Sequence, residues 1–362
     1  MRTFADLPGR VERLARERER VALVLIDGLG RRALERHADH PLLRRIASDG
    51  EIVPLASQFP STTTAHLTTL YTGRPVGEHG LYEWRVYEPT LDQVIQPLPF
   101  EADGRPLDLD PRALVPGPTL FERLAQAGVP CTAVQPGHIW PSRYGSAALA
   151  GADVVTFERL EDGVRSLAVP EGLAYLYHDG VDAQGHDDGP SSPAFETAAR
   201  AALDAVEAGM RRLPRGTLLV LTADHGQIDV SPDRLDLLDA AWPGLLDALA
   251  RDKRGCALPP AGSARDCFLH IAPGRAREVV EELAPRLGDR AEVRLAADLV
   301  DAGTFGPVGS RLRSRLADVC VLPAPGRMAW LAAFPGPERR FRGHHGGLTP
   351  EETETWVALL ET

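Results

Sequence analysis

Three uninterrupted apolar runs along the chain predict strands of a buried sheet. They cover residues 21–26, 173–177 and 217–221. An apolar run without polar alternation is typical of a central strand that is covered on both faces. Each run ends in a segment of acidic residues, histidine and glycine. We therefore expect polar side chains at the carboxyl ends of these strands.

Helical patterns separate the predicted strands. Helices are expected over residues 119–127 and 193–210, the second with Ser192 as N-cap and Pro193 in its first turn. Alternating strands and helices predict an α/β fold with a doubly wound, largely parallel central sheet and helices on both faces. Ligands of such sheets bind outside the carboxyl ends of the strands, which is where the polar segments fall.

Residues 236–329 have a different pattern, with a leucine-rich helical lead-in followed by a loop, a strand, a helix and a second strand. We predict a small α/β insertion here. It divides the core into a first part, residues 1–235, and a C-terminal part, residues 330–362. The capping box at residues 349–352 predicts that a terminal helix follows the loop at 342–348.

Composition and charge exclude several classes of protein. The net charge of −11, with Lys253 as the single lysine, argues against general nucleic-acid binding. The four cysteines are widely spaced and form no C-x-x-C pair, so we expect reduced core residues. The N-terminal segment is charged, and no apolar run approaches the roughly 18 residues of a membrane span. We expect a cytoplasmic protein without membrane association.

Two clusters have the residue types of metal ligands. Asp182 and His186 lie at i and i+4, and Asp224 and His225 are neighbours at a predicted strand end. Either pair alone is also explained as a cap or loop contact. Together with Asp27, however, three strand ends of one sheet carry ligand types and no lysine lies among them. This pattern favours a metal site over three separate caps.

A run of hydroxyl residues at 61–64 leads into a helix that we expect to start near Thr64. The unpaired backbone N–H groups at such a helix start favour a phosphoryl group. An ordinary threonine N-cap is the structural alternative.

These residues, in this order along the chain, resemble the alkaline phosphatase superfamily, and above all its type I phosphodiesterase/nucleotide pyrophosphatase branch. The resemblance covers nearly the whole chain except the insertion. It is carried by seven ordered motifs: Asp27-Gly, Pro60-Ser-Thr-Thr63, Thr72-Gly73, His79-Gly80, Asp182-x-x-Gly-His186, Asp224-His225-Gly226 and His345-Gly346.

The resemblance implies two divalent cations and a covalent phospho-threonine intermediate. Thr63 would be the nucleophile, with Thr62 as the one-residue alternative, and His345 would be preferred to His344 because the family's ligand directly precedes glycine. The resemblance implies zinc, with manganese as a second candidate. One metal would be held by Asp27, Thr63, Asp224 and His225, and the other by Asp182, His186 and His345.

The sequence departs from the family at two positions near the nucleophile. Relatives that cleave nucleotides have an aromatic residue after the nucleophile, where this chain has Thr64. They also have a phosphate-binding asparagine where this chain has Trp84, and the chain contains no asparagine. As replacement donors we expect the backbone N–H groups of Thr63 and Thr64, together with the Trp84 indole or the Tyr82 hydroxyl.

A mixed segment at 135–144 is a candidate leaving-group pocket, with loop packing as the alternative. Its candidate substrate residues are His138, Trp140 and Arg143. His66, His79 and His178 are expected to be structural.

We expect a dinuclear-metal hydrolase that cleaves phosphodiester or phosphoanhydride bonds of a small phosphorylated substrate. The alternatives on the same scaffold are a phosphomonoesterase and a phosphonate hydrolase. A non-catalytic phosphate-binding protein is the alternative from a different class.

Overall fold

A seven-stranded sheet forms the core of the protein. The structure is a computed structural model that describes residues 2–334, 336 and 340–362. All neighbouring strands of this sheet pair in parallel except at β19, which runs antiparallel to both of its neighbours. The strand order is β2 (Glu51–Ala56), β19 (Glu354–Glu361), β10 (Leu218–Thr222), β1 (Arg20–Ile26), β9 (Gly172–His178), β7 (Cys131–Pro136) and β8 (Asp153–Phe157).

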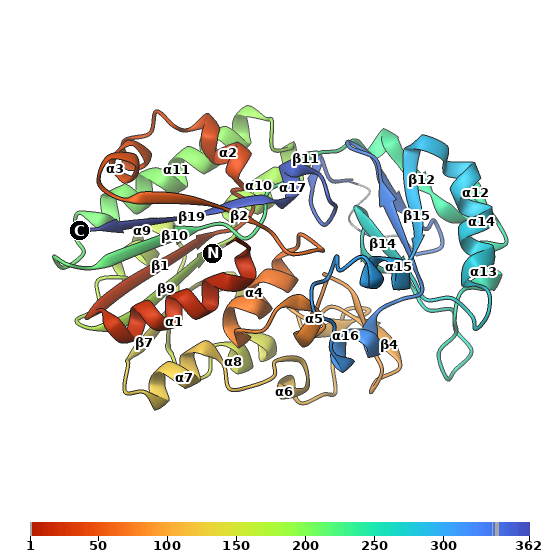
Figure 1. Cartoon of the computed structure of the whole chain (residues 1–362), viewed down its shortest axis with the longest axis horizontal. Helices are drawn as coiled ribbons and strands as arrows, with labels where there is room; N and C mark the ends of the chain where they lie inside the picture. The colour runs from red at the N-terminus through yellow and green to blue at the C-terminus, as the bar shows by residue number, and fades with distance from the viewer. Residues whose placement is uncertain (1, 335, 337–339) are drawn as a thin grey trace.

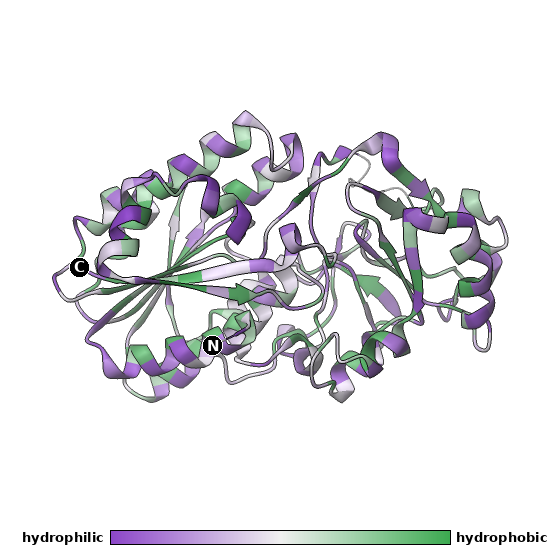
Figure 2. Cartoon of the chain, turned by 45° about the horizontal axis from the view of Figure 1, so that its top comes forward, coloured by the Kyte–Doolittle hydropathy of each residue, from purple (hydrophilic) through white to green (hydrophobic). Residues whose placement is uncertain are grey.

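Helices cover both faces of this sheet (Figure 1). The side chains of β1 alternate between two apolar clusters. Val21, Leu23 and Leu25 pack with α1 (Leu7–Glu17), α4 (Thr63–Thr72) and α7 (Leu120–Gln126). Ala22, Val24 and Ile26 pack on the opposite face with α3 (Pro41–Asp49) and α11 (Pro193–Met210). In Figure 2 the strands are largely hydrophobic between helices whose outer faces are hydrophilic. The predicted doubly wound, largely parallel sheet is confirmed.

The prediction of a terminal helix is wrong. The capping box at Thr349 and Glu352 does form, but it opens only the four-residue helix α17 (Pro350–Thr353). The chain then enters β19, which inserts between β2 and β10. Thr355, Trp356 and Val357 have high strand propensity and are buried there, so sheet packing overrides the helix signal of the cap.

A second sheet lies beside the core, at the right of Figure 1. Its strands are antiparallel, in the order β13 (Ala261–Ser263), β14 (Asp266–Leu269), β16 (Val319–Pro323) and β15 (Ala291–Leu295). Helix α14 (Ala276–Leu287) packs against it around its own apolar cluster. This sheet falls within the segment predicted as an insertion, whose boundaries at 236 and 329 stay a prediction.

The remaining elements are short. The helices are α2 (Arg31–Arg36), α5 (Val76–His79), α6 (Pro111–Leu114), α8 (Arg143–Ala148), α9 (Leu160–Arg165), α10 (Gly180–Asp188), α12 (Leu238–Ala241), α13 (Leu245–Ala248), α15 (Ala296–Asp301) and α16 (Ser310–Arg315). The strands are β3 (Val86–Glu88), β4 (Gln93–Ile95), β5 (Glu101–Ala102), β6 (Arg105–Pro106), β11 (Ile228–Asp229), β12 (Leu235–Leu237), β17 (Met328–Trp330) and β18 (Gly343–His344).

Two composition-based expectations are tested by this fold. Cys131, Cys267 and Cys320 are buried as predicted, whereas Cys256 is exposed, so the core prediction is wrong for that residue. Within the described ranges, no helix combines the length and apolar character needed to cross a bilayer.

Candidate active site

The carboxyl ends of three neighbouring strands bring acidic residues and histidines together. β1 lies between β10 and β9 in the sheet. Asp27 follows β1, and Asp224 and His225 follow β10. Asp182 and His186 lie on α10, which begins directly after β9. Because parallel strands end at the same edge of a sheet, these residues converge as the sequence predicts.

Asp27, Asp224 and His225 form the first group of potential metal ligands. All three are buried, and their ligand atoms lie within 4.8 Å of one another. His225 Nε2 is 3.4 Å from Asp27 Oδ1 and 3.4 Å from Asp224 Oδ2. Gly28, with a φ of 71°, turns the chain directly after β1, and its N–H donates to Asp224 Oδ1 at 3.2 Å. This turn holds two carboxylates at one point.

Asp182, His186 and His345 form the second group. His186 Nε2 is 3.3 Å from Asp182 Oδ2, and His345 Nε2 is 3.6 Å from Asp182 Oδ1. The two Nε2 atoms are 3.2 Å apart. Ligand atoms around a tetrahedral zinc ion are about 3.3 Å apart, given Zn–N distances of about 2.0–2.1 Å. The spacing of the second group therefore fits one cation.

The backbone fixes the tautomer of each histidine in the two groups. His186 Nδ1 contacts the carbonyl of Gly343 at 2.9 Å, and His345 Nδ1 contacts that of Ser61 at 2.9 Å. His225 Nδ1 lies 3.1 Å from its neighbouring carbonyl at position 226. A carbonyl oxygen only accepts, so each Nδ1 carries a proton, and in the neutral ring each Nε2 has the lone pair that a metal ligand needs. All three rings thus present the ligand form of imidazole.

Asp27 and Asp224 are too buried and too close to other carboxylates to remain charged without a counter-ion. Burial and the nearby Asp224 and Asp182 raise the pKa of Asp27 well above its usual range. Burial and then Asp182 raise the pKa of Asp224 to about 7. The pKa of Asp182 is lowered, because the attraction of His186 and His345 outweighs the effect of burial. Asp224 Oδ2 is buried without a hydrogen-bond partner. This donor set fits divalent cations.

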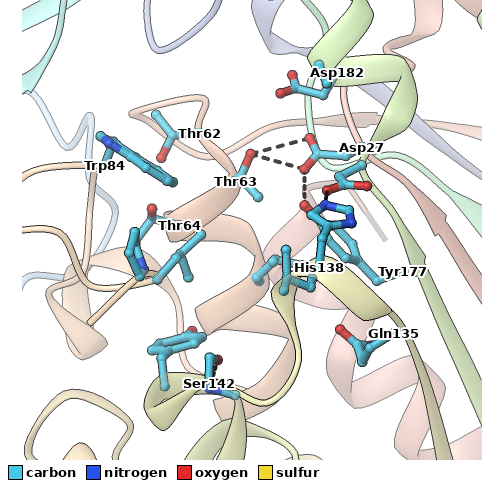
Figure 3. Close-up of a pocket in the computed structure, with 18 of the residues that line it drawn as sticks. Asp27, Thr62, Thr63, Thr64, Trp84, Gln135, His138, Ser142, Tyr177 and Asp182 are labelled. Carbon is cyan, nitrogen blue, oxygen red and sulfur yellow. Dashed lines mark hydrogen bonds and ion pairs between the residues drawn. The ribbon is translucent and has the colours of Figure 1, made fainter. Parts of the chain in front are cut away.

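The two candidate threonines have different environments. Thr62 is the N-cap of α4, where its hydroxyl accepts from the Ala65 N–H at 3.4 Å and donates to the Tyr82 carbonyl at 3.3 Å. Thr63 Oγ1 lies 3.2 Å and 3.3 Å from the two carboxylate oxygens of Asp27 (Figure 3). It also lies 3.1 Å from His225 Nε2. The structure therefore brings the Thr63 hydroxyl, rather than that of Thr62, to the first ligand group.

Two residues that support the ligands were not anticipated from the sequence. The Tyr177 hydroxyl donates to Asp27 Oδ2, as Figure 3 shows. Gln227 Nε2 donates to the Asp182 carbonyl at 2.9 Å and also to its carboxylate. The alternation of β9 puts Tyr175 and Tyr177 on one face, but nothing in the sequence indicates that Tyr177 alone reaches the site. Gln227 directly follows a ligand motif, which is the one available signal.

A cavity of about 630 Å³ opens over both ligand groups. Much of its wall is apolar or aromatic, and the part of the chain that the structure describes contributes no lysine or arginine to it. The predicted substrate residues Thr64, Trp84, His138 and Trp140 line it. The apolar and aromatic lining residues are Leu67, Tyr71, Trp84, Leu98, Pro99, Ile139, Trp140, Pro141, Tyr144, Leu149, Tyr177, Ala183 and Phe341.

Tyr82 and Arg143 do not line this cavity, which corrects their predicted place in the pocket. Tyr82 is buried, and its hydroxyl donates to the Arg315 carbonyl at 3.5 Å. The Arg143 guanidinium donates to the carbonyls of Leu107 and Leu109 at 2.5 Å and 2.8 Å. Both side chains are therefore used in packing the loops behind the pocket.

Trp84 and His138 line the cavity but already have polar partners. The hydrogen-bond pattern orients the Gln96 amide so that its oxygen accepts from Trp84 Nε1 at 2.8 Å. His138 Nε2 is 2.7 Å from the Asp179 carboxylate. The indole N–H of Trp84 thus already has a partner in Gln96, contrary to the expectation that it replaces the missing asparagine.

The three histidines expected to be structural lie outside the cavity lining. His66 Nδ1 contacts the Thr62 carbonyl at 2.6 Å, and its Nε2 accepts from the Gln58 N–H at 2.9 Å. Burial lowers the pKa of His66 to about 4, so this ring is neutral and braces the start of α4. His79 Nε2 lies 3.0 Å from Thr69 Oγ1, in the same buried layer.

Comparison with known proteins shows which solved structures have a similar fold. None of the curated protein sequences matches this chain significantly. An inactive variant of murine ectonucleotide pyrophosphatase/phosphodiesterase 5 in complex with AMP is 19% identical, with a TM-score of 0.71 over 94% of this chain and 87% of that chain. The human protein is 19% identical, with a TM-score of 0.70 and coverages of 94% and 87%. Phosphonoacetate hydrolase from Sinorhizobium meliloti, in complex with phosphonoacetate, is 18% identical, with a TM-score of 0.68 and coverages of 94% and 90%.

At these identities the structural likeness establishes only the fold, and the family model shows to which protein family the chain belongs. The model of the type I phosphodiesterase/nucleotide pyrophosphatase family matches residues 21–348, which is most of the chain. The matched range contains every residue of the two ligand groups. The chain therefore belongs to the type I phosphodiesterase/nucleotide pyrophosphatase family of phosphoester hydrolases.

Proposed function

We propose that this protein is a metal-dependent hydrolase that cleaves phosphodiester or phosphoanhydride bonds, with Thr63 as nucleophile. The observation that carries the proposal is the position of Thr63 Oγ1, 3.1 Å from His225 Nε2 and 3.2 Å from Asp27 Oδ2. Asp182, His186 and His345 of the second ligand group line the same cavity as Thr63. The AMP bound to the murine relative supports a small nucleotide-like substrate.

Seven residues would hold the two cations. Asp27, Thr63, Asp224 and His225 would bind one, and Asp182, His186 and His345 the other. When bound, two divalent cations lower the pKa of a coordinated hydroxyl and neutralise charge on the attacking and leaving oxygens. Three imidazoles among the donors favour zinc over manganese.

The chain's own groups would orient the attack. The Thr63 hydroxyl donates to the Asp27 carboxylate at 3.2 Å, and this contact would hold the hydroxyl oxygen in place for attack on the phosphorus. The backbone N–H groups of Thr63 and Thr64 lie in the first turn of α4 and have no acceptor within the helix. They would donate to phosphoryl oxygens. Thr63 would form a phosphoester as the leaving group departs, and water would then hydrolyse that ester.

The lining of the cavity favours a diester over a monoester or a phosphonoacetate-like substrate. A monoester dianion or an additional carboxylate would find no lysine or arginine among the described lining residues. Asp179 and Glu83 also line the cavity and oppose further negative charge. The aromatic walls at Trp84 and Trp140 suit an uncharged ring, such as the base of a nucleotide.

The test compares three substrates with zinc or manganese supplied: bis-p-nitrophenyl phosphate, p-nitrophenyl phosphate and phosphonoacetate. We expect a preference for the diester. Thr63→Ala should lower kcat by about 10³-fold or more, and the neighbouring variant Thr62→Ser, which keeps the cap hydroxyl, is the matched control. A large preference for the monoester would support a phosphomonoesterase instead. Equal turnover by Thr63→Ala and the parent would support a non-catalytic phosphate-binding protein.

A further inference from the structure

Three residues that line the cavity carry a buried polar atom without a hydrogen-bond partner. These atoms are Thr64 Oγ1, Glu83 Oε1 and His344 Nε2. An unsatisfied buried polar group costs about 1–3 kcal/mol, so a ligand is the expected partner when such a group faces a binding cavity. Glu83 is set aside, because its carboxyl lies close enough to Asp266 that, after burial, it is the main cause that raises the pKa of Asp266. His344 offers the best defined geometry.

The backbone sets the tautomer of His344 opposite to that of the candidate ligands. Its Nδ1 accepts the N–H of His345 at 2.9 Å. An amide N–H only donates, so Nδ1 holds a lone pair and the proton of the neutral ring lies on Nε2. His186 and His345 instead donate through Nδ1 and present a lone pair at Nε2. His344 is therefore a hydrogen-bond donor and is unsuited to act as a metal ligand through Nε2.

The ring of His344 is held rigidly beside the second ligand group. Its centroid is 5.3 Å from that of His186 and 5.8 Å from that of His345. The residue is 4% exposed, and its backbone pairs with Ile228 where β18 meets β11. Phe341 packs edge-on against the ring at 5.3 Å. These contacts fix the direction of the Nε2–H bond before any substrate binds.

The side chains expected to replace the family's asparagine as neutral donors, Tyr82 and Trp84, already have other partners. The chain contains no asparagine. The Tyr82 hydroxyl donates to a backbone carbonyl, and the Trp84 indole donates to Gln96. A neutral donor stabilises developing negative charge without adding a positive charge beside two cations.

We propose that His344 binds the substrate, donating its Nε2–H to a phosphoryl oxygen. This assignment rests on the proposed function, since it requires a phosphoryl group over the second ligand group. It makes His344 a residue of the phosphate-binding site that is distinct from the neighbouring ligand His345.

The test uses two substitutions that both remove the Nδ1 acceptor but differ in the donor. His344→Leu removes the Nε2–H, whereas His344→Gln retains an N–H donor of similar reach. His270→Leu is the matched control, because His270 Nε2 is also buried without a partner but lies outside the cavity lining. Zinc binding and the affinity of the zinc-loaded protein for inorganic phosphate are measured by calorimetry. Cleavage of bis-p-nitrophenyl phosphate is measured in parallel.

We expect His344→Leu to bind two zinc ions, to bind phosphate about tenfold more weakly and to lose about 10²-fold in kcat, the size expected for one oxyanion donor. His344→Gln should recover most of both losses, and His270→Leu should match the parent. Unchanged phosphate affinity in His344→Leu would overturn the proposal, and so would loss of a zinc ion in both His344 variants.

Two further measurements keep the outcome decisive. If the parent binds phosphate but cleaves no diester, the proposed function fails while the phosphate affinities still decide the role of His344. If His344→Leu does not fold, proton–nitrogen NMR of the parent takes its place. The Nε2–H resonance that is missing in His344→Gln should shift when phosphate is added, and a resonance that does not move would overturn the proposal.

Discussion

Replacement of Arg265 by methionine should destabilise the protein strongly, because it leaves Glu352 buried without its counter-ion. The side chains of Arg265 and Glu352 are 1% and 0% exposed. The guanidinium meets the carboxylate through two contacts of 3.0 Å, from Nε to Oε1 and from Nη2 to Oε2. Its Nη1 also donates to the carbonyls of three residues between 323 and 327. Removing one member of such a buried pair costs about 3–5 kcal/mol.

The loss of stability caused by Arg265→Met should be smaller at low pH than at neutral pH. Burial alone would raise the pKa of Glu352, but Arg265 and hydrogen bonds from Thr349 and Gly347 hold it below its usual range. The ion pair therefore contributes stability above the unfolded-state pKa of about 4.3 and loses it as the pH falls through the folded-state value. In the variant, protonation of Glu352 relieves the buried charge, so the loss of stability should be smaller at pH 4.5 than at pH 7.

Urea unfolding at both pH values measures this prediction. The variant carrying both Arg265→Met and Glu352→Met replaces the pair by apolar side chains and should be more stable than Arg265→Met alone. A loss below about 0.5 kcal/mol for Arg265→Met at pH 7 would refute the reasoning, since that is the effect of an ordinary surface substitution. An equal loss at both pH values would refute the role of the Glu352 charge.

Three further predictions concern the ligand groups and the cavity. Gln227→Leu should weaken zinc binding about 10–100-fold by releasing the Asp182 carboxylate, as measured by competition with a chelator; unchanged affinity would show that Asp182 needs no such support. Thr64→Val removes a buried hydroxyl without a partner, so thermal unfolding of the substrate-free protein should show equal or higher stability, by up to about 1 kcal/mol, and a marked loss would reveal a hidden partner. Without metal, stability should fall as the pH rises from 6.5 to 8.5, because the raised pKa of Asp224, about 7, makes the folded state hold a proton that the unfolded state has lost. Added zinc should therefore raise the melting temperature more at pH 8.5 than at pH 6.5, and a flat profile of the metal-free protein would contradict this reasoning.

The positions of the candidate ligands could be predicted because they depend on strand topology. Asp27 and Asp224 directly follow apolar runs, and parallel strands end at one edge of a sheet, so their convergence needs no knowledge of side-chain packing. Which of His344 and His345 can serve as a metal ligand, in contrast, depends on local backbone contacts. Their opposite tautomers come from the carbonyl of Ser61 and the N–H of His345, and periodicity carries no information about such contacts.

The pocket and the end of the fold could be predicted only in part. Arg143 and Tyr82 have the chemistry of phosphate ligands, but the carbonyls of Leu107 and Arg315 compete for them, and those partners lie far away along the chain. The capping box at Thr349 is a real local signal, yet it says nothing about how far the helix continues. Burial between β2 and β10, a tertiary effect, decides that the following residues form a strand.

The place of β19 has a consequence for how the protein is made. A ribosome releases β19 after every other strand of the large sheet, yet this strand lies between β2 and β10 and pairs with both. His345 immediately precedes this part of the chain, so the second ligand group also stays incomplete until then. The nascent chain must therefore keep the β19-facing edge of β2 unpaired through most of its synthesis and that of β10 until β19 emerges, and the second ligand group is complete only after His345 has emerged.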